Sequence, residues 1–338
     1  MTDTASQSKP RLLIVYDTYE LPNVRKFKRE EAKGVRDALR AEGYEAKAIN
    51  IDDLQLQDDG SITCKGRAFD VSHYDGVWWR TANRVDRSGI PHRKPDNRPL
   101  AEAIEAQVSP FTPFSRMVEA DSKVLSQAVF EQHDLPTPLT IALHENQPEQ
   151  EAEQQLDAFL DKLPPGPIVI KRDRGQGGYG RKMVASKEEA RQVALKWRKT
   201  APENNGVGVV VQQMIAGPLV RVEVAVSDDE AHIFSAKEQY QSGSAQGDLA
   251  LQVAETFGPG VWGVDMMGIP PRVLEANPLS SMSEFEMRQN PQDNLYVDSA
   301  KVFADTIAGR MQKGRPEGVL ETAAHCGTVH AERACERV

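Results

Sequence analysis

The stretch that most constrains this chain covers residues 261–281 and carries two acidic residues around a proline turn. Apolar residues fill 261–267, the tetrapeptide Gly-Ile-Pro-Pro follows, and a second extended segment covers 272–275. Two adjacent prolines interrupt any central strand or helix, so the pattern predicts a hairpin. In that hairpin Asp265 and Glu275 are expected to lie opposite each other or nearly so, with Cβ atoms roughly 4.5–5.5 Å apart.

Asn277 adds a third oxygen to the same side of the predicted hairpin. It follows Glu275 by two positions, and side chains at that spacing share one face of a strand. Mg²⁺ prefers such oxygen ligands and usually combines one or two carboxylates with substrate phosphates. A solvent-facing hairpin with ordinary acidic residues is the alternative, but the apolar flanks make burial of unpaired carboxylates costly. The stretch therefore predicts a metal site and, with it, a bound nucleotide.

Composition limits the class of protein. The 338 residues are 39% hydrophobic and 27% charged, which suits two or three packed globular units. The polar first residues and the lack of a long apolar window predict a cytoplasmic protein with no membrane partner. Three cysteines without a close pair fit a reducing compartment. The net charge of −9 argues against general nucleic-acid binding.

The first third of the chain reads as an α/β unit. Strands are predicted at 11–16, 45–49 and 74–80, a helix at 28–42, and a hairpin over 54–69 around an Asp-Asp-Gly turn. The third strand would deliver Arg80 to the carboxyl end of the sheet, where open α/β sheets bind ligands. Arg80 is therefore a candidate substrate contact.

A basic segment follows this strand. Residues 80–98 contain six Arg or Lys side chains and almost no apolar periodicity. Two interpretations remain open: a solvated connection, or an electrostatic landing site for an acidic substrate on an otherwise negative protein.

The remainder alternates helices, strands and one glycine loop. Helices are predicted at 100–108, 116–133, 147–163, 187–199, 248–257 and 295–311, an extended piece at 110–115, and strands at 168–171, 183–184, 207–215, 219–226 and 231–240. The loop that carries Gly175, Gln176, Gly177, Gly178 and Gly180 joins two strands instead of opening a helix. This excludes a Walker-type loop, but such a loop can fold over phosphates and donate backbone N–H groups.

Together these features resemble the ATP-grasp superfamily. The features are Lys123 in a helix, Lys171 before the glycine loop, a strand ending Gln-Gln-Met-Ile, and the spacing Asp-x9-Glu-x-Asn. The closest likeness is to RimK-like ligases, with glutathione-synthetase-like features. The resemblance implies an α/β fold with a Rossmann-like pre-ATP-grasp domain and a two-part ATP-grasp domain whose antiparallel sheets clamp ATP. The predicted divisions are a disordered 1–10, a pre-ATP-grasp domain at 11–115, a lid subdomain at 116–206, a C-terminal subdomain at 207–312 and a tail at 313–338.

The resemblance also assigns roles to single residues. It implies that Lys123 and Lys171 contact the ATP phosphates, that the loop at 175–180 closes over them, and that the backbone of Gln213, Met214 and Ile215 meets the adenine. It implies that Asp265, Glu275 and Asn277 bind Mg²⁺, two ions being expected and Mn²⁺ an alternative. Two departures concern the substrate side: Leu219 stands where relatives have an acidic ribose contact, with Glu223 as a candidate substitute, and the relatives' Arg-x-Asn element is absent from 239–251. Ser280 and Ser281 are candidate substrate contacts, or else ordinary residues of an Asn-Pro turn.

The implied chemistry is ATP-dependent ligation. A carboxylate attacks the γ-phosphate, an acyl phosphate forms, and an amine displaces phosphate, with Arg221 stabilising the charged intermediates. The expected substrate is an amino acid or a peptide, acidic if the basic segment receives it, and ribosomal-peptide modification is one possibility. A kinase or phosphatase-like enzyme without ligation, and a regulatory nucleotide-binding protein with a decayed site, are the alternatives. Relatives often form dimers or tetramers, so a homo-oligomer is possible.

Overall fold

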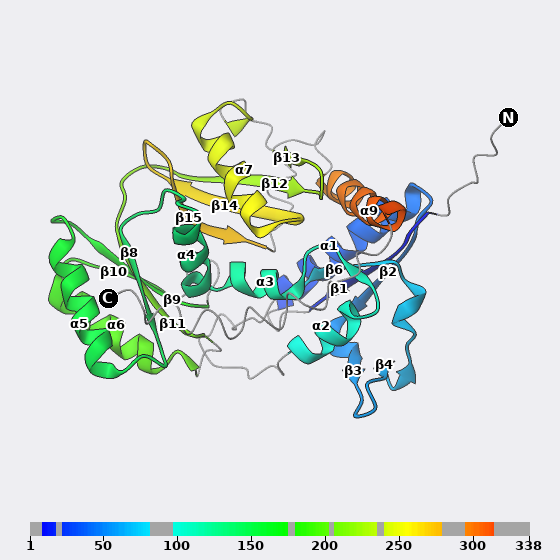
Figure 1. The fold of residues 1–338 in the computed structure, drawn as a ribbon, viewed down its shortest axis with the longest axis horizontal. Coiled ribbons are helices and arrows are strands. Elements are labelled where there is room, and N and C mark those ends of the chain that lie inside the picture. The colour runs from blue at the N-terminus through cyan, green and yellow to red at the C-terminus, as the bar shows by residue number, and fades with distance from the viewer. Residues whose placement is uncertain are drawn as a thin grey trace.

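The computed structural model describes residues 9–17, 22–81, 97–174, 180–202, 206–234, 240–278 and 295–313. Within these residues, three four-stranded sheets and one small three-stranded sheet organise the fold, and helices cover the larger sheets (Figure 1). The mixed α/β architecture with antiparallel sheets is the predicted fold class.

The first sheet is parallel. Its strands are, in spatial order, β2 (Glu45–Asn50), β1 (Arg11–Tyr16), β6 (Gly76–Arg80) and β7 (Ser109–Pro110). Helix α1 (Pro22–Ala41) connects β1 to β2, which confirms the predicted βαβ start, although α1 begins at Pro22 instead of residue 28. The fully buried run Leu12–Val15 explains the apolar signal, because helices cover both faces of this sheet.

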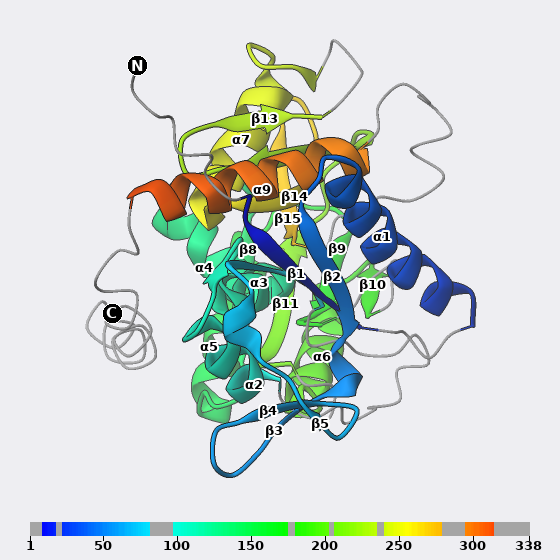
Figure 2. The same ribbon diagram turned by 90° about the vertical axis from the view of Figure 1, so that its right-hand side faces the viewer.

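Alternate residues of β1 and β6 pack into two different clusters. Leu12, Ile14 and Trp78 face α1 and the C-terminal helix α9 (Leu295–Lys313). Figure 2 shows α9 crossing beside α1 over this side of the sheet. Leu13 and Trp79 face the opposite way, toward α2 (Arg98–Glu105) and α3 (Phe114–Asp121). The period of two along each strand therefore builds two cores from one sheet.

A small antiparallel sheet extends this unit. It contains β3 (Leu54–Leu56), β4 (Ile62–Cys64) and β5 (Arg67–Ala68), with 3₁₀ turns at Ile51–Asp53 and Val71–His73. The hairpin predicted over 54–69 is confirmed.

The second sheet is antiparallel throughout. Its order is β10 (Arg181–Val184), β9 (Ile168–Arg172), β11 (Gly208–Gln213) and β8 (Thr140–His144), with α5 (Glu149–Lys162) and α6 (Lys187–Lys199) packed on its apolar face. Strand β8 was not predicted from the sequence. The glycine loop joins β9 to β10 as expected, and residues 175–179 of it lie outside the described residues.

The third sheet is also antiparallel and contains the predicted hairpin of Asp265 and Glu275. Its order is β13 (Ala231–Ile233), β12 (Leu219–Val226), β14 (Gly260–Met267) and β15 (Arg272–Asn277), with α7 (Ala245–Phe257) packed against it. The strand predicted at 231–240 ends at Ile233, and residues 235–239 lie outside the described residues.

The prediction of one helix over 116–133 is wrong. The chain forms α3 and then α4 (Lys123–Gln132), separated by Ser122 in an extended conformation with φ −87° and ψ 120°. The Ser122 hydroxyl accepts a hydrogen bond from Leu125 N at 3.1 Å, which caps α4. Helix α3 also begins at Phe114, so the predicted extended piece at 110–115 is shorter than expected. As a result Lys123 is the first residue of a helix and not an interior residue.

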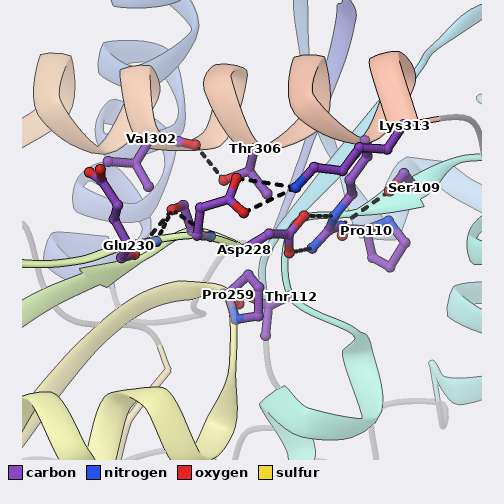
Figure 3. Close-up of polar contacts among 12 residues, drawn as sticks. Ser109, Pro110, Thr112, Asp228, Glu230, Pro259, Val302, Thr306 and Lys313 are labelled. Carbon is purple, nitrogen blue, oxygen red and sulfur yellow. Dashed lines mark hydrogen bonds and ion pairs between the residues drawn. The ribbon is translucent and has the colours of Figure 1, made fainter.

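Polar contacts join the first and third sheets where α9 ends (Figure 3). Arg310 donates to both carboxylate oxygens of Asp228 at 2.7 Å and to the Ser109 hydroxyl at 3.1 Å. The Thr112 hydroxyl donates to the Pro259 carbonyl at 2.6 Å. Arg310 therefore connects β7 with the turn between β12 and β13, and Thr112 connects the residues after β7 with the turn between α7 and β14. The domain boundaries proposed from the sequence stay predictions.

Within the described part of the chain, no helix has the length and apolarity that a membrane span requires.

Candidate functional site

Three charged residues form a row across the third sheet. The register pairs Arg221 of β12 with Asp265 of β14, and Asp265 with Glu275 of β15. Arg221 donates from Nε to Asp265 Oδ1 and from Nη2 to Asp265 Oδ2, both at 2.7 Å. The predicted pairing of Asp265 with Glu275 is confirmed, and the structure adds the arginine on the other side.

Asn277 completes the predicted oxygen cluster. Its Nδ2 donates to Asp265 Oδ2 at 3.2 Å, so the two side chains share one face of the hairpin. A register shift after Asp265 places an extra residue, Leu274, between Val273 and Glu275 on β15. Such a bulge turns the strand locally and re-aims the following side chains.

Two lysines from other elements complete the site. Lys123 extends from the start of α4 and its Nζ lies 3.8 Å from Glu275 Oε2. Helix α4 packs against both β11 and β15, so it stands between the second and third sheets (Figure 1). Lys171 lies near the end of β9, is only 8% exposed, and interacts electrostatically with Glu275 and Lys123. Both predicted lysines are therefore brought to the predicted acidic pair.

The protonation behaviour of the site follows from burial and close charges. The pKa of the Lys171 ammonium falls to about 8, mainly because of burial and in part because of the Lys123 charge, while Glu275 opposes the shift. Burial alone would raise the pKa of Glu275, but the two lysines hold it below its ordinary value. Burial raises the pKa of Asp265, although Arg221 opposes that effect. The site therefore holds concentrated positive charge around two carboxylates, which suits a polyanionic ligand.

The predicted adenine contacts lie at the end of β11. Gln213 N donates to the Leu139 carbonyl at 2.8 Å, and Met214 N donates to the Pro167 carbonyl at 3.2 Å. Met214 is exposed, whereas Gln213 and Ile215 are half-buried. This segment connects the second sheet to β12 of the third sheet, so it lies where the two sheets meet.

The remaining predicted site residues differ in burial, and several lie outside the described residues. Arg80 is fully buried at the end of β6 and pairs with Glu31 at 2.8 Å, so its role as a substrate contact stays a prediction. Glu223 lies on β12 two positions after Arg221 and is half-buried. Gly180 immediately precedes β10, with φ +70° and its carbonyl accepting from Arg172 N at 2.7 Å. Several predicted residues lie outside the described residues: Gly175, Gln176, Gly177, Gly178, Ser280, Ser281 and most of the basic segment.

Ser122 and Asp173 are connected to the site, although neither was predicted from the sequence as a site residue. Ser122 caps α4, and the Asp173 carboxylate accepts hydrogen bonds from the Ser122 hydroxyl and from Val124 N. A serine before Lys-Val-Leu is a recognisable helix start signal, which could have found Ser122. Asp173 lies in the segment Lys-Arg-Asp-Arg-Gly, and the sequence alone shows only that charged residues precede the glycine loop.

The donor set fits Mg²⁺ better than a transition metal. Among the described residues, no cluster of three or more His, Cys, Asp or Glu side chains could hold a metal ion. Two carboxylates and one amide oxygen on adjacent strands are instead the hard, incomplete oxygen set that Mg²⁺ shares with phosphates. To bind the ion, the side-chain amide of Asn277 must turn its oxygen toward it, in place of the Nδ2 group that donates to Asp265.

Comparisons with known proteins agree with this architecture at the level of fold. No protein-family model matches the sequence, and no curated protein matches it. Solved structures match over nearly the whole chain. A RimK domain ATP-grasp protein from Sphaerobacter thermophilus aligns with TM-score 0.56 and 17% identity, over 88% of this chain and 98% of its own.

Two further structures extend the comparison. The VanG D-Ala:D-Ser ligase from Enterococcus faecalis aligns with TM-score 0.62 and 15% identity, over 89% of this chain and 99% of its own. A D-alanine–D-alanine ligase from Bacillus anthracis, solved with ATP, aligns with TM-score 0.57 and 14% identity, over 90% of this chain and 100% of its own. The chain therefore has the fold of these three solved structures, one of which is named as an ATP-grasp protein.

Proposed function

We propose that this protein is an ATP-dependent ligase that activates a carboxylate as an acyl phosphate and joins it to an amine. The observation that carries the proposal is the row of Arg221, Asp265 and Glu275 in an ATP-grasp fold, with Lys123 and Lys171 directed to its acidic end. Cations from three separate elements converge on two carboxylates, an arrangement that suits a triphosphate and its metal.

The lysines would bind the triphosphate. Lys123 and Lys171 come from a helix start and a strand end, so their backbones are held by regular structure. Burial of Lys171 excludes water and strengthens its attraction to phosphate. Asp265, Glu275 and Asn277 would hold Mg²⁺, which would neutralise charge on the transferring phosphoryl group.

Arg221 would stabilise the reacting oxygens. A guanidinium has five N–H donors, and two of those of Arg221 bind Asp265, so three remain for a substrate oxygen. Asp265 fixes the plane of the guanidinium and raises the pKa of Arg221 despite burial, so the group stays charged. A fixed cation at the site of developing negative charge lowers the barrier without rearrangement.

In the proposed reaction, a substrate carboxylate oxygen forms a bond to the γ-phosphorus and ADP leaves. The amine nitrogen of the second substrate then attacks the acyl carbon, inorganic phosphate leaves, and the amine loses a proton. The substrate class that we propose is an amino acid or a peptide. The basic composition of residues 80–98 supports an acidic peptide, and modification of ribosomal peptides is one such role. Ser280 and Ser281 are proposed to contact it, and the protein is proposed to act in the cytoplasm.

Incubation of the full chain with ATP, Mg²⁺ and panels of amino acids and acidic peptides tests this function. The expected result is ADP formation coupled to a product whose mass equals both substrates minus water. Glu275→Ala should abolish both, whereas Glu230→Ala, a control at an exposed acid of the same sheet region, should not. ADP with a phosphorylated substrate would indicate a kinase, ADP with phosphate alone a hydrolase, and ATP binding without turnover a regulatory protein.

A further inference from the structure

Asp173 connects the elements that carry the two lysines. It follows Lys171 by two residues, directly after β9, and its residue surface is 1% exposed. Its Oδ1 accepts from the Ser122 hydroxyl and from Val124 N at 3.0 Å, and its Oδ2 accepts from Val207 N at 3.0 Å. One carboxylate therefore binds α4 and the residue before β11.

The backbone of Asp173 adds a further bond to α4. Its carbonyl accepts from Lys123 N at 3.2 Å. The first N–H groups of a helix have no partners within the helix. Here Asp173 binds the N–H groups of Lys123 and Val124, and Ser122 binds that of Leu125. The negative charge also lies at the positive end of α4, where it stabilises the helix.

These bonds fix the start of α4 relative to β9. Lys123 is the first residue of α4, and Lys171 belongs to β9, so the separation of their backbones depends on the junction at Asp173. The Asp173 carboxylate is fully buried among protein groups, with three hydrogen-bond donors on its oxygens and Arg174 Nε 3.5 Å from Oδ2, so it faces protein and not a ligand. Its influence on a ligand must therefore act through the lysines.

We propose that Asp173, with Ser122, is the positioning residue that sets Lys123 against Lys171 for binding a nucleotide triphosphate. This inference rests on the proposed function. It predicts that loss of the Asp173 carboxylate weakens binding of the phosphates and leaves binding of the adenine end unchanged, since that end lies at the other terminus of β11.

The test compares MgATP and adenosine binding to the full chain by calorimetry. Asp173→Asn keeps the size of the side chain but replaces one acceptor oxygen with a donor. We expect about a 10-fold or greater loss of ATP affinity, because small misplacements of binding groups have large effects, and an unchanged adenosine affinity. Ser122→Ala, a milder change, should give a smaller loss in the same direction and covers the case in which Asp173→Asn does not fold.

A double-mutant cycle separates positioning from general destabilisation. If Asp173 acts through Lys123, then Asp173→Asn should have less than about a 2-fold effect on ATP affinity in a Lys123→Ala background. Leu156→Ala is the control for stability, because Leu156 is fully buried in the core of the same sheet on α5, a helix that carries neither lysine. It should leave the ratio of ATP to adenosine affinity unchanged.

Two outcomes would overturn this inference and leave the proposed function standing. One is that Asp173→Asn causes the same loss of ATP affinity in the wild-type and Lys123→Ala backgrounds. The other is that neither Asp173→Asn nor Ser122→Ala loses ATP affinity although the wild type binds ATP. A wild-type chain that binds no MgATP would refute the proposed function and this inference with it.

Discussion

Arg221 and Asp265 face each other across β12 and β14, 44 residues apart in the sequence, and form two parallel hydrogen bonds of 2.7 Å. Such bidentate pairs fix orientation as well as charge. The pair joins the residue proposed for acyl-phosphate stabilisation to a residue proposed for metal binding, so the two functions share one rigid unit.

Arg221→Ala should lower turnover by about 10²-fold or more, because the cation at the developing negative charge is lost. It should also lower the free energy of unfolding by about 1–3 kcal/mol, since Asp265 stays buried without its partner while the arginine side chain is 31% exposed. Arg221→Lys should give turnover and stability between those of the wild type and Arg221→Ala, because lysine keeps the charge but not the bidentate geometry. Steady-state kinetics and urea denaturation measure the two effects, and unchanged turnover in Arg221→Ala would remove this residue from the mechanism.

Lys171→Met should separate binding from stability. Methionine fills a similar volume without a charge, and the Lys171 ammonium is disfavoured by burial, so stability should stay the same or rise. ATP affinity should fall by about 10- to 100-fold because a desolvated phosphate contact is lost. The control is Lys182→Met on neighbouring β10, where the side chain is 45% exposed. Equal ATP affinities for the two variants would contradict a phosphate role for Lys171.

Glu105 should make stability depend on pH. It accepts from Trp79 Nε1 and from Phe114 N, both at 2.7 Å, and burial raises its pKa to about 7. The folded state therefore keeps a proton that the unfolded state loses above about pH 4.5, so stability is highest below that pH and falls as pH rises to about 7.

Glu105→Gln should remove this dependence and stabilise the protein at pH 8 by about 1–3 kcal/mol, because the glutamine oxygen still accepts both bonds without a buried charge. Urea denaturation at several pH values measures the change, with Glu255→Gln, at an exposed position on α7, as the control. A variant with the same pH slope as the wild type would show that Glu105 is not the group responsible.

Arg310→Ala should loosen the connection between the first and third sheets. Arg310 donates twice to Asp228, once to the Ser109 hydroxyl and once to the Pro110 carbonyl, and its side chain is 21% exposed. We expect a loss of about 1–2 kcal/mol in unfolding free energy. The control is Lys313→Ala, which removes the neighbouring ion pair of Lys313 with Asp229. Because these side chains are 63% and 72% exposed, this substitution should change the free energy of unfolding little. Comparable losses in the two variants would contradict a specific connection through Arg310.

The sequence predicted the parts of the site that depend on local pattern. Two prolines between extended segments were enough to pair Asp265 with Glu275, because hairpin partners are close in the chain. The order of strands was not predictable in the same way. Nothing local indicates that β12 lies beside β14, so the contact of Arg221 with Asp265 appeared only in the structure.

The break between α3 and α4 shows a second limit. Helical periodicity continues through Ser122, so pattern alone favoured one helix over 116–133. The break is stabilised by Asp173, which is 51 residues away from Ser122 in the sequence. The hydrogen bonds that Asp173 accepts replace those that a continuous helix would have made. Helix ends that depend on distant partners are therefore poorly predicted from local sequence.

The hairpin and the two lysines are proposed to bind ATP together with Mg²⁺. The most direct measurement is ATP affinity by calorimetry with Mg²⁺ and with a chelator, for the wild type and for Glu275→Gln. We predict that Mg²⁺ tightens ATP binding to the wild type by about 10-fold or more and that Glu275→Gln abolishes this gain. A wild-type chain that does not bind ATP, or a gain from Mg²⁺ that survives in Glu275→Gln, would contradict the claim.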